Sequence, residues 1–503
     1  MNALAQAKAA SSGDAGQEIQ SSTILQMPKS IDKITVLDSI PLRALAFATM
    51  LAAGFAITLT VDEVHHSEVR GLQLLASMSL VKVFGIVIVG TILLVLLVKY
   101  AEVTLAFFFL VGMFKGDPRL SSTPVDLTIL VGALVALAVV LRLISSRRAL
   151  SVPTEYFLYL PLICLMVLSL FYTPDFSAGL EKTLRFVFLT GLGIVAPFMI
   201  FDSPVKIRRF MITMLGGGIL LAVNSLFMLG GQERLVAPSG LNTELGSACA
   251  AGLVIIWGLL FPECSFFKRL LLYPVVGLLA IGMVGSGGRL ANASAVICII
   301  ISIFLCRKLF RDALIMGGLG LLALPFVWIP DASYEYLSSL AHPPEAMGTR
   351  SGLMELGISL MGEHPLLGVG IQGFRYHSPN PVTYNFPHNI FLELGSEMGA
   401  LAALVFAGIL IYSFREIAHQ LTNHSTKHEP LVHTVFLLMI FVFLDSMVSG
   451  DINDLRFMWF VLGLPYVLRG LYSKYLPGFG KAETRWNPTY AARYAASDFE
   501  YLT

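Results

Sequence analysis

The stretch VDLTILVGALVALAVVLRL, residues 125–143, decides the fold class of the chain. Its charged residues, Asp126 and Arg142, lie near its two ends, and the residues between them are almost entirely apolar. About 20 such residues, at a helical rise of 1.5 Å each, cross the hydrocarbon core of a bilayer. A strand of a membrane barrel would instead alternate polar and apolar residues. The stretch therefore predicts a transmembrane helix.

Comparable stretches recur along the 503 residues, of which 56% are hydrophobic and 13% charged. The mean hydropathy is +0.75. Because a soluble domain carries about 25% charged residues, the composition excludes an ordinary soluble enzyme. We predict an all-α fold, a polytopic transmembrane helix bundle of about 12–14 spans. The fourteen candidate stretches are residues 41–60, 78–98, 101–114, 125–143, 153–172, 183–201, 206–229, 246–262, 270–284, 290–306, 311–330, 388–413, 432–448 and 453–470.

The charge balance and the motifs exclude several classes of protein. Lysine and arginine number 34 against 33 acidic residues, whereas a nucleic-acid binder would show a basic excess. The five cysteines are scattered, without the spacing of a metal site. The chain carries no phosphate-binding P-loop, no dinucleotide-binding glycine motif and no GxSxG element. We expect neither a cofactor nor a metal.

Basic loops alternate with acidic or mixed loops, and this sets the predicted orientation. Loops rich in lysine and arginine stay in the cytoplasm, which places both termini there. The predicted parts are a disordered cytoplasmic leader (1–40), a transmembrane bundle (41–330), a large periplasmic loop (331–387), C-terminal transmembrane helices (388–470) and a cytoplasmic tail (471–503). The leader lacks the apolar segment of a cleavable signal peptide.

The loop at residues 331–387 is the longest polar segment on the predicted outer side. Connections without a function are usually much shorter, about 4–6 residues. Apolar residues recur within TRSGLMELGISLMGEHPLLGVG, residues 349–370, and predict an amphipathic helix on or near the membrane: Leu353, Leu356, Ile358, Leu360 and Met361. Arg350, Arg375, His364 and His377 in this loop are candidate substrate contacts or, alternatively, surface and packing residues.

Three polar segments end spans on the predicted outer side. The first is Gly230 to Glu244, with Arg234 and Asn242; the second is Gly285 to Ser294, with Arg289; the third is Pro387 to Glu397, with His388.

Arg289 follows a serine and three glycines, at the point where a span begins. An arginine at membrane depth is costly, so it normally faces a cavity or a partner. A guanidinium binds phosphate in a bidentate manner, and glycines and a helix N-terminus favour an anion. These features predict a diphosphate site. The alternative is an interfacial arginine, with glycines that allow close helix packing.

His388 begins the third segment, and histidine is the side chain best suited to accept a proton near neutral pH. Three polar residues recur behind it on one helical face, namely Asn389, Glu393 and Glu397. Carboxylates in an apolar span need partners, and Arg289 or Arg234 are the candidates. The alternative is a structural polar stripe that joins two helices.

Four segments of the sequence resemble segments of a known family. HPLLGVGIQGF (364–374), followed by PHNIFLELGSEMGALAALVF (387–406), resembles the signature of the O-antigen ligase/polymerase superfamily. RLVAPSGLNTELGSACA (234–250) and GSGGRLANAS (285–294) are similar to two further segments of that family. The chain differs from the family pattern at Leu241–Thr243, where ligases have Asn-Pro-Asn, and at Gly288, where the family has serine.

The resemblance implies metal-independent, inverting glycosyl transfer at the periplasmic face of the bacterial inner membrane. The implied donor is an oligosaccharide on undecaprenyl diphosphate. By position, Arg289 and Arg234 would hold the diphosphate, and His388 would take the proton of the acceptor hydroxyl. The remaining candidate substrate-binding residues are Asn242, Asn389, Arg350, Glu393 and Glu397.

The acceptor separates two activities within the family. A polymerase adds repeat units of O-antigen or exopolysaccharide to one another, whereas a ligase moves the glycan to lipid A–core or to a protein. The altered Asn motif favours a polymerase. The implied partners are this donor, a glycan or lipid A–core acceptor, membrane lipid, and chain-length regulators or export proteins, but no nucleic acid.

Two other classes fit the sequence less well. A polysaccharide transporter or flippase would carry charged or broken helices at the bilayer midplane and repeat symmetry. Here the polar residues gather at the outer ends of spans. A membrane scaffold would leave the arginines and the histidine at those ends without a role.

Overall fold

The computed structural model describes residues 90–91, 94–115, 126–145, 154–227, 235–323, 345–379, 385–448 and 451–475. The chain divides into two units, Met1–Val95 and Leu96–Thr503. Almost all described residues belong to the second unit.

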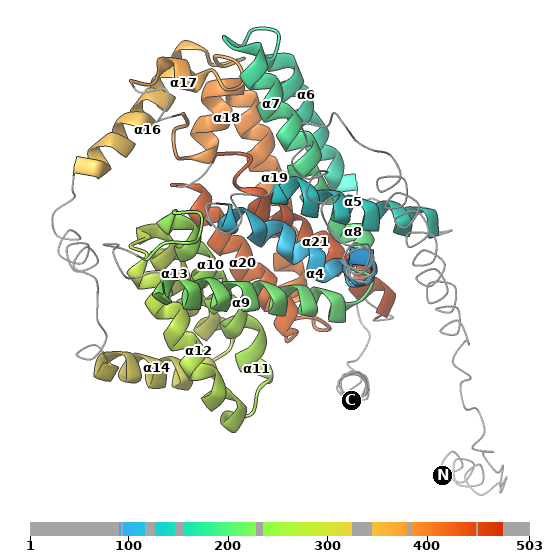
Figure 1. The fold of residues 1–503 in the computed structure, drawn as a ribbon, viewed down its shortest axis with the longest axis vertical. Helices are drawn as coiled ribbons and strands as arrows, with labels where there is room; N and C mark the ends of the chain where they lie inside the picture. Colours follow the sequence, from blue (N-terminus) through green and yellow to red (C-terminus); the bar gives the residue numbers. More distant parts are fainter. Residues whose placement is uncertain are drawn as a thin grey trace, which may run out of the picture. The chain divides into compact units, whose positions relative to one another are not determined.

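Every regular element in the described ranges is a helix, as the sequence predicts (Figure 1). The elements are α4 (Ala101–Leu110), η2 (Val111–Phe114), α5 (Leu127–Ser145), η3 (Thr154–Leu158), α6 (Tyr159–Ser169), α7 (Phe176–Arg185), η4 (Phe186–Thr190), α8 (Gly191–Ile200), α9 (Pro204–Phe227), α10 (Asn242–Ile255), η5 (Ile256–Leu260), α11 (Phe261–Glu263), α12 (Phe266–Gly285), α13 (Arg289–Leu305), α14 (Leu309–Ala323), α16 (Glu345–Glu363), α17 (Phe374–His377), α18 (Ile390–Met398), α19 (Ala400–Thr422), α20 (Pro430–Ser446) and α21 (Arg456–Tyr475).

Six helices in the described part are long and apolar enough to cross a membrane, and four more apolar helices are shorter. The six are Leu127–Ile144, Phe176–Ile200, Pro204–Phe227, Asn242–Glu263, Phe266–Gly285 and Ala400–Thr422. A polytopic helical bundle is therefore confirmed. The predicted span 41–60 and most of 78–98 lie outside the described residues, as do the leader and the tail beyond Tyr475, the last residue of α21.

One predicted span is wrong in its continuity. Residues 388–413 form two helices, α18 and α19, with Gly399 between them. Gly399 has φ +82°, a conformation that side chains with a Cβ rarely adopt. A Cβ at this position would also collide with the carbonyl of Leu366. The close approach of the large loop therefore breaks the helix here, and hydropathy alone does not report it.

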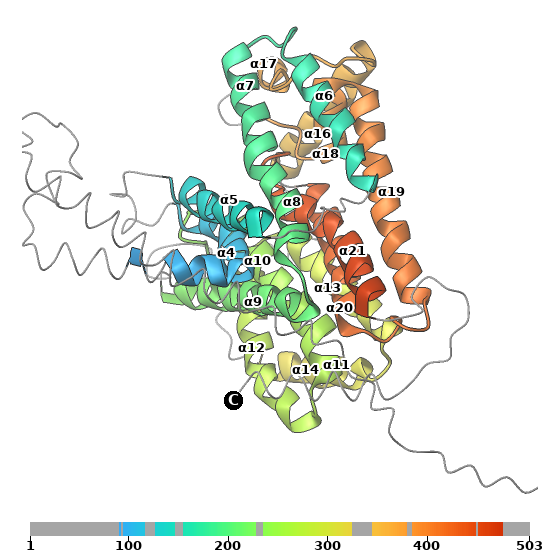
Figure 2. The same ribbon diagram turned by 90° about the vertical axis from the view of Figure 1, so that its right-hand side faces the viewer.

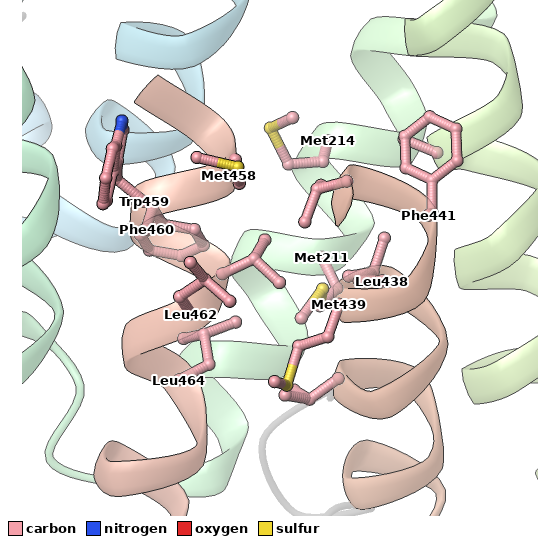
Figure 3. Close-up of a cluster of buried hydrophobic side chains, with 14 of the residues drawn as sticks. Met211, Met214, Leu438, Met439, Phe441, Met458, Trp459, Phe460, Leu462 and Leu464 are labelled. Atoms are coloured by element: carbon pink, nitrogen blue, oxygen red, sulfur yellow. The ribbon is translucent and has the colours of Figure 1, made fainter. Parts of the chain in front are cut away.

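The core is built where α9, α20 and α21 meet (Figure 3). Figure 3 shows Met211 and Met214 of α9 facing Leu438 of α20 and Met458 of α21. Trp459, at 0% exposure, packs edge-on against Phe186 and Phe406, so that α21 joins helices from both halves of the chain. Aromatic pairs of this kind contribute about 0.5–1.5 kcal/mol beyond the area they bury.

The continuous helix of α10, η5 and α11 has ends of different character. It begins at Asn242, which contacts Ser286. It ends at Glu263, which forms an ion pair with Arg208, one of the residues in a predicted cytoplasmic loop. The predicted polar segments and the predicted basic loops therefore lie at opposite ends of this helix. Both views place α18 beside α6 and α7, and α16 packs against α18 (Figures 1 and 2).

Candidate functional site

The first two polar segments meet at the beginnings of α10 and α13. The Asn242 side-chain amide donates a hydrogen bond to the backbone carbonyl of Ser286, 3.0 Å away. The backbone N–H of Leu235 donates to the carbonyl of Gly285, also at 3.0 Å. The Gly288 N–H in turn donates to the Ser286 hydroxyl at 3.2 Å. Residues 235–242 and 285–288, which the sequence places on one side, therefore form one local structure.

Two glycines of these segments serve close packing. A Cβ on Gly246 would lie 2.7 Å from the Ser286 hydroxyl, and one on Gly285 would collide with the Leu235 side chain. This geometry agrees with the packing alternative for those positions. Arg289 is the first residue of α13, but its side chain lies outside the described part, as does all of Arg234. The diphosphate site therefore stays a prediction.

The last turn of α20 links these segments to the third one. The Ser247 hydroxyl on α10 donates to the Asp445 carboxylate, with O–O distances of 3.2 and 3.3 Å. Two residues further along, the carbonyl of Met447 accepts a hydrogen bond from the Asn389 side-chain amide at 3.3 Å. The beginnings of α10 and α18 are thus both anchored on the same turn.

His388 lies directly before α18, in a left-handed backbone conformation with φ +56°. Such a conformation costs a non-glycine residue about 1–3 kcal/mol and is often found at functional sites. The Asn389 side chain caps the helix behind it by accepting hydrogen bonds from the N–H groups of Phe391 and Leu392. The His388 ring packs edge-on against Phe386, with centroids 4.4 Å apart. These contacts hold the imidazole at the beginning of α18.

The surroundings of His388 keep its ring neutral. Burial lowers the pKa of the imidazole to about 4, and the positive charge of Arg350 on α16 contributes to this shift. Arg350 itself is exposed. At neutral pH the His388 ring therefore carries a free lone pair, which a proton acceptor needs.

The expected partner of the two glutamates is wrong. Glu393 and Glu397 do lie on one face of α18, but they contact Lys182 of α7. The Lys182 ammonium lies 2.6 Å from Glu393 Oε1 and 2.8 Å from Glu397 Oε2. All three side chains are almost completely buried, with exposed fractions of 5%, 2% and 1%. We call these three residues the lysine cluster.

The loop before α21 closes over the lysine cluster. The N–H of Ile452 donates to Glu393 Oε1 at 3.3 Å. The Asn453 amide donates to the Lys182 carbonyl at 3.1 Å. Segments far apart in the sequence, from α7, α18 and residues 451–455, are therefore joined at one point.

The glycines of HPLLGVGIQGF are used to pack the large loop against α18. The N–H groups of Val369 and Gly370 donate to the carbonyls of Ser396 and Glu397, at 2.8 and 2.9 Å. A Cβ on Gly368 would collide with the backbone at Glu397. On the other side of this turn, the Thr173 hydroxyl donates to the Ile371 carbonyl at 2.6 Å. The turn thus fixes α18 relative to the start of α7.

The predicted amphipathic helix of the large loop is α16. Leu353 and Leu360 are buried, and Leu356 packs against them. Ile358 is 60% exposed and lies on the other face. A Cβ on Gly357 would lie 3.4 Å from Pro387, so that α16 packs directly against the residue before His388.

Other loop residues of the prediction take different positions. Arg375 stacks over the ring of Tyr376, 5.3 Å from its centroid. His364 and His377 are exposed. None of the contacts described for these three residues joins them to His388. Within the described ranges, no group of three or more His, Cys, Asp or Glu residues is arranged to hold a metal ion.

Sequence reasoning missed Lys182 and Asp445. Lys182 follows Glu181 in a predicted outer loop, and Asp445 interrupts an apolar span. A signal for Lys182 was present, because a cation on the outer side is an exception to the positive-inside pattern, as Arg289 is. Its contact with residues 211 and 215 positions away had no signal in the sequence.

Part of the chain is similar to a known protein family. Residues 274–407 match the model of a family described as O-antigen ligase. No curated protein matches the chain. The matched residues include α13, the large loop and α18, and they extend into α19. Lys182, the start of α10 and the end of α20 lie outside the match.

The match confirms the resemblance that the sequence motifs indicate. It supports glycosyl transfer of the O-antigen ligase/polymerase type in general, with a lipid-linked glycan as substrate and a multi-pass membrane protein as the setting. Residues 274–407 are therefore similar to the O-antigen ligase family, and this match supports membership of the O-antigen ligase/polymerase superfamily.

Proposed function

We propose that the protein transfers a glycan from undecaprenyl diphosphate to a glycan hydroxyl, and so polymerises O-antigen or exopolysaccharide repeat units. The reaction would be inverting and independent of metal, and it would take place at the periplasmic face of the inner membrane. The proposal combines the family match at residues 274–407 with the geometry around the last turn of α20.

The observation that carries the proposal is the shared anchoring of two helix beginnings. Ser247 near the start of α10 contacts Asp445, and Asn389, which follows His388, contacts Met447 two residues further along. Asn242, the first residue of α10, contacts Ser286. Arg289 begins α13, whose preceding turn is bonded to Asn242. A diphosphate at the start of α13 and a proton acceptor before α18 would then serve one reaction centre.

In the proposed step the acceptor hydroxyl oxygen attacks the anomeric carbon of the donor sugar. The new C–O bond forms as the bond from this carbon to the phosphate oxygen breaks, and undecaprenyl diphosphate leaves with the electron pair. The hydroxyl proton passes to a ring nitrogen of His388. General base catalysis of this kind contributes about 10²–10⁴-fold. Arg289 and Arg234 would stabilise the charge that develops on the leaving diphosphate.

An in vitro assay tests the reaction class. Purified protein, undecaprenyl-diphosphate glycan and acceptor are incubated with a chelator. We expect a lengthened lipid-linked glycan and release of undecaprenyl diphosphate. If the intact donor instead moves across the membrane of vesicles that contain the protein, with no new glycosidic bond, the protein is a flippase.

A ligase is the second candidate, because the family match at residues 274–407 fits either activity. Deletion of the gene separates the two activities. A polymerase is expected to leave a single capped repeat unit and no long glycan. Accumulation of full-length, undecaprenyl-linked polymer would contradict the polymerase and support the ligase.

A further inference from the structure

Lys182 connects the proton acceptor of the proposed function with a helix far away in the sequence. It lies in α7, outside the residues that match the family. Its ammonium contacts Glu393 and Glu397 of α18, and its own carbonyl is bonded to Asn453. In both views α7 and α18 lie close together (Figures 1 and 2).

The lysine cluster contains more carboxyl groups than cations. One ammonium faces two carboxyl groups, and Asp451 lies close enough to add a further negative charge. Glu393 Oε2 and Glu397 Oε1 are buried, and no described residue forms a hydrogen bond with either oxygen. Loss of one partner from a buried ion pair leaves an uncompensated charge that the protein interior does not tolerate. The contact with Lys182 therefore stabilises the two glutamates in this buried position.

α18 is short and depends on contacts at its ends and on one face. It has 9 residues, too few for a helix to be stable in isolation. Asn389 fixes the beginning of α18 to the end of α20. Backbone hydrogen bonds from Val369 and Gly370 fix its end, before Gly399. Lys182 contacts the helix face between these two points. His388 lies two residues before the helix, so that a shift of α18 displaces its ring.

We propose that Lys182 is a positioning residue for His388, acting through Glu393, Glu397 and α18. This inference rests on the proposed function, in which His388 accepts the proton. A displacement of about 1 Å in a reacting group can cost about 100-fold in rate. The ionisable groups around the lysine cluster are Glu393, Glu397 and Asp451, and Arg350 faces His388.

The test compares purified wild-type protein with Lys182→Met. We expect kcat for glycan transfer to fall about 100-fold, while KM for the lipid-linked donor changes little, because the proposed diphosphate site lies at α13. Lys182→Arg, which keeps the charge, should recover part of the loss. The matched control is Lys206→Met, which removes an ion pair with Asp202 one turn away on the surface. It should leave both constants unchanged.

The pH profile distinguishes positioning from a purely structural role. In the wild type the acid limb of kcat/KM should lie near the pKa of His388, about 4. If α18 moves in Lys182→Met, the ring becomes solvated and the limb should shift upward toward about 6.5. A general loss of folded protein would lower the amplitude without moving the limb.

Each outcome decides one of the two claims. Absence of transfer by the wild type would contradict the proposed function, not the role of Lys182. Wild-type kcat and an unmoved acid limb in Lys182→Met would overturn the role of Lys182. If Lys182→Met does not fold, the exchange Lys182→Glu/Glu393→Lys keeps one cation and two carboxylates. Recovery of kcat by this exchange supports positioning. Failure of the exchange variant to fold or to recover kcat would overturn positioning and leave Lys182 a role in stability alone.

Discussion

Among the described residues, two buried ion clusters differ in their numbers of cations and carboxyl groups. In the first, which we call the arginine cluster, Arg269 of α12 pairs with Asp312 of α14 at 2.6 Å, and the Tyr273 hydroxyl donates to the other carboxylate oxygen at 2.9 Å. One cation meets one anion, and both carboxylate oxygens are satisfied. The lysine cluster has one cation for two carboxyl groups and leaves two oxygens without a partner.

The two clusters also differ in their distance along the structure from His388: the arginine cluster is a structural contact, and the lysine cluster lies beside the proposed proton acceptor. Arg269 of the arginine cluster belongs to a predicted cytoplasmic loop, and none of the described contacts of this cluster reaches His388 or α18. The lysine cluster lies on the helix that carries His388 at its beginning. Buried groups with unmet hydrogen bonds are uncommon and call for an explanation. In the lysine cluster, the required position of α18 supplies one.

The largest expected effect concerns the arginine cluster. Arg269→Met leaves Asp312 buried without its cation, and removal of one partner of a buried pair costs about 3–5 kcal/mol. We expect a clear fall in thermal unfolding temperature, measured in detergent by intrinsic fluorescence. The kcat of the folded fraction should stay near the wild-type value. A loss of kcat as large as that of Lys182→Met would remove the distinction between the two clusters.

A substitution at the break between α18 and α19 should lower the stability of the protein nearly as much. Gly399→Ala places a Cβ at φ +82° against the Leu366 carbonyl, and the strain alone costs about 1–3 kcal/mol. Gly408→Ala, in the middle of α19, is the matched control, because nothing lies within 4 Å of its Cβ. The control should be neutral or up to about 1 kcal/mol stabilising. Equal unfolding temperatures for the two variants would show that the helix is not broken at Gly399.

Glu393→Gln in the lysine cluster should have a smaller effect on stability than the corresponding substitution in the arginine cluster. It removes one of two negative charges around Lys182 and keeps the shape and an acceptor oxygen. We expect a stability within about 1 kcal/mol of the wild type. Asp312→Asn removes the single anion facing Arg269 and should cost about 3–5 kcal/mol. If both substitutions destabilise equally, the charge of Glu393 is as necessary beside Lys182 as the charge of Asp312 is beside Arg269, and the contrast between the two clusters fails.

The smallest expected effect is a shift in pH dependence. The charge of Arg350 helps to lower the pKa of His388, so Arg350→Gln should raise that pKa. The neutral ring is the active form, and activity is lost as the pH falls through the pKa. The acid limb of kcat/KM should therefore move upward by less than about one unit, while the rate at pH 7 stays nearly constant. A downward shift would show that Arg350 does not act on His388 through its charge.

The helical fold and the two signature segments could be predicted from the sequence, because hydropathy and short motifs are local. Long apolar runs predict helices whatever their neighbours are. The break at Gly399 could not be predicted this way, since it depends on the approach of Leu366 from the large loop.

The candidate site was only partly accessible from the sequence. The sequence placed Asn242 and His388 on one side, and it predicted that Glu393 and Glu397 share a face. Their true partner, Lys182, is separated from them by more than two hundred residues. The Ser247–Asp445 contact is of the same kind. Such pairings depend on how helices pack, which no local pattern encodes.

The most direct test of the central claim is a single-turnover measurement of glycan transfer by His388→Ala. The protein is assayed with undecaprenyl-diphosphate glycan in the presence of a chelator, beside wild type and His419→Ala, an exposed histidine near the end of α19. We expect the rate to fall by at least about 100-fold in His388→Ala, with donor binding retained, and to be unchanged in His419→Ala. Transfer by His388→Ala at the wild-type rate would contradict the assignment of His388 as the proton acceptor.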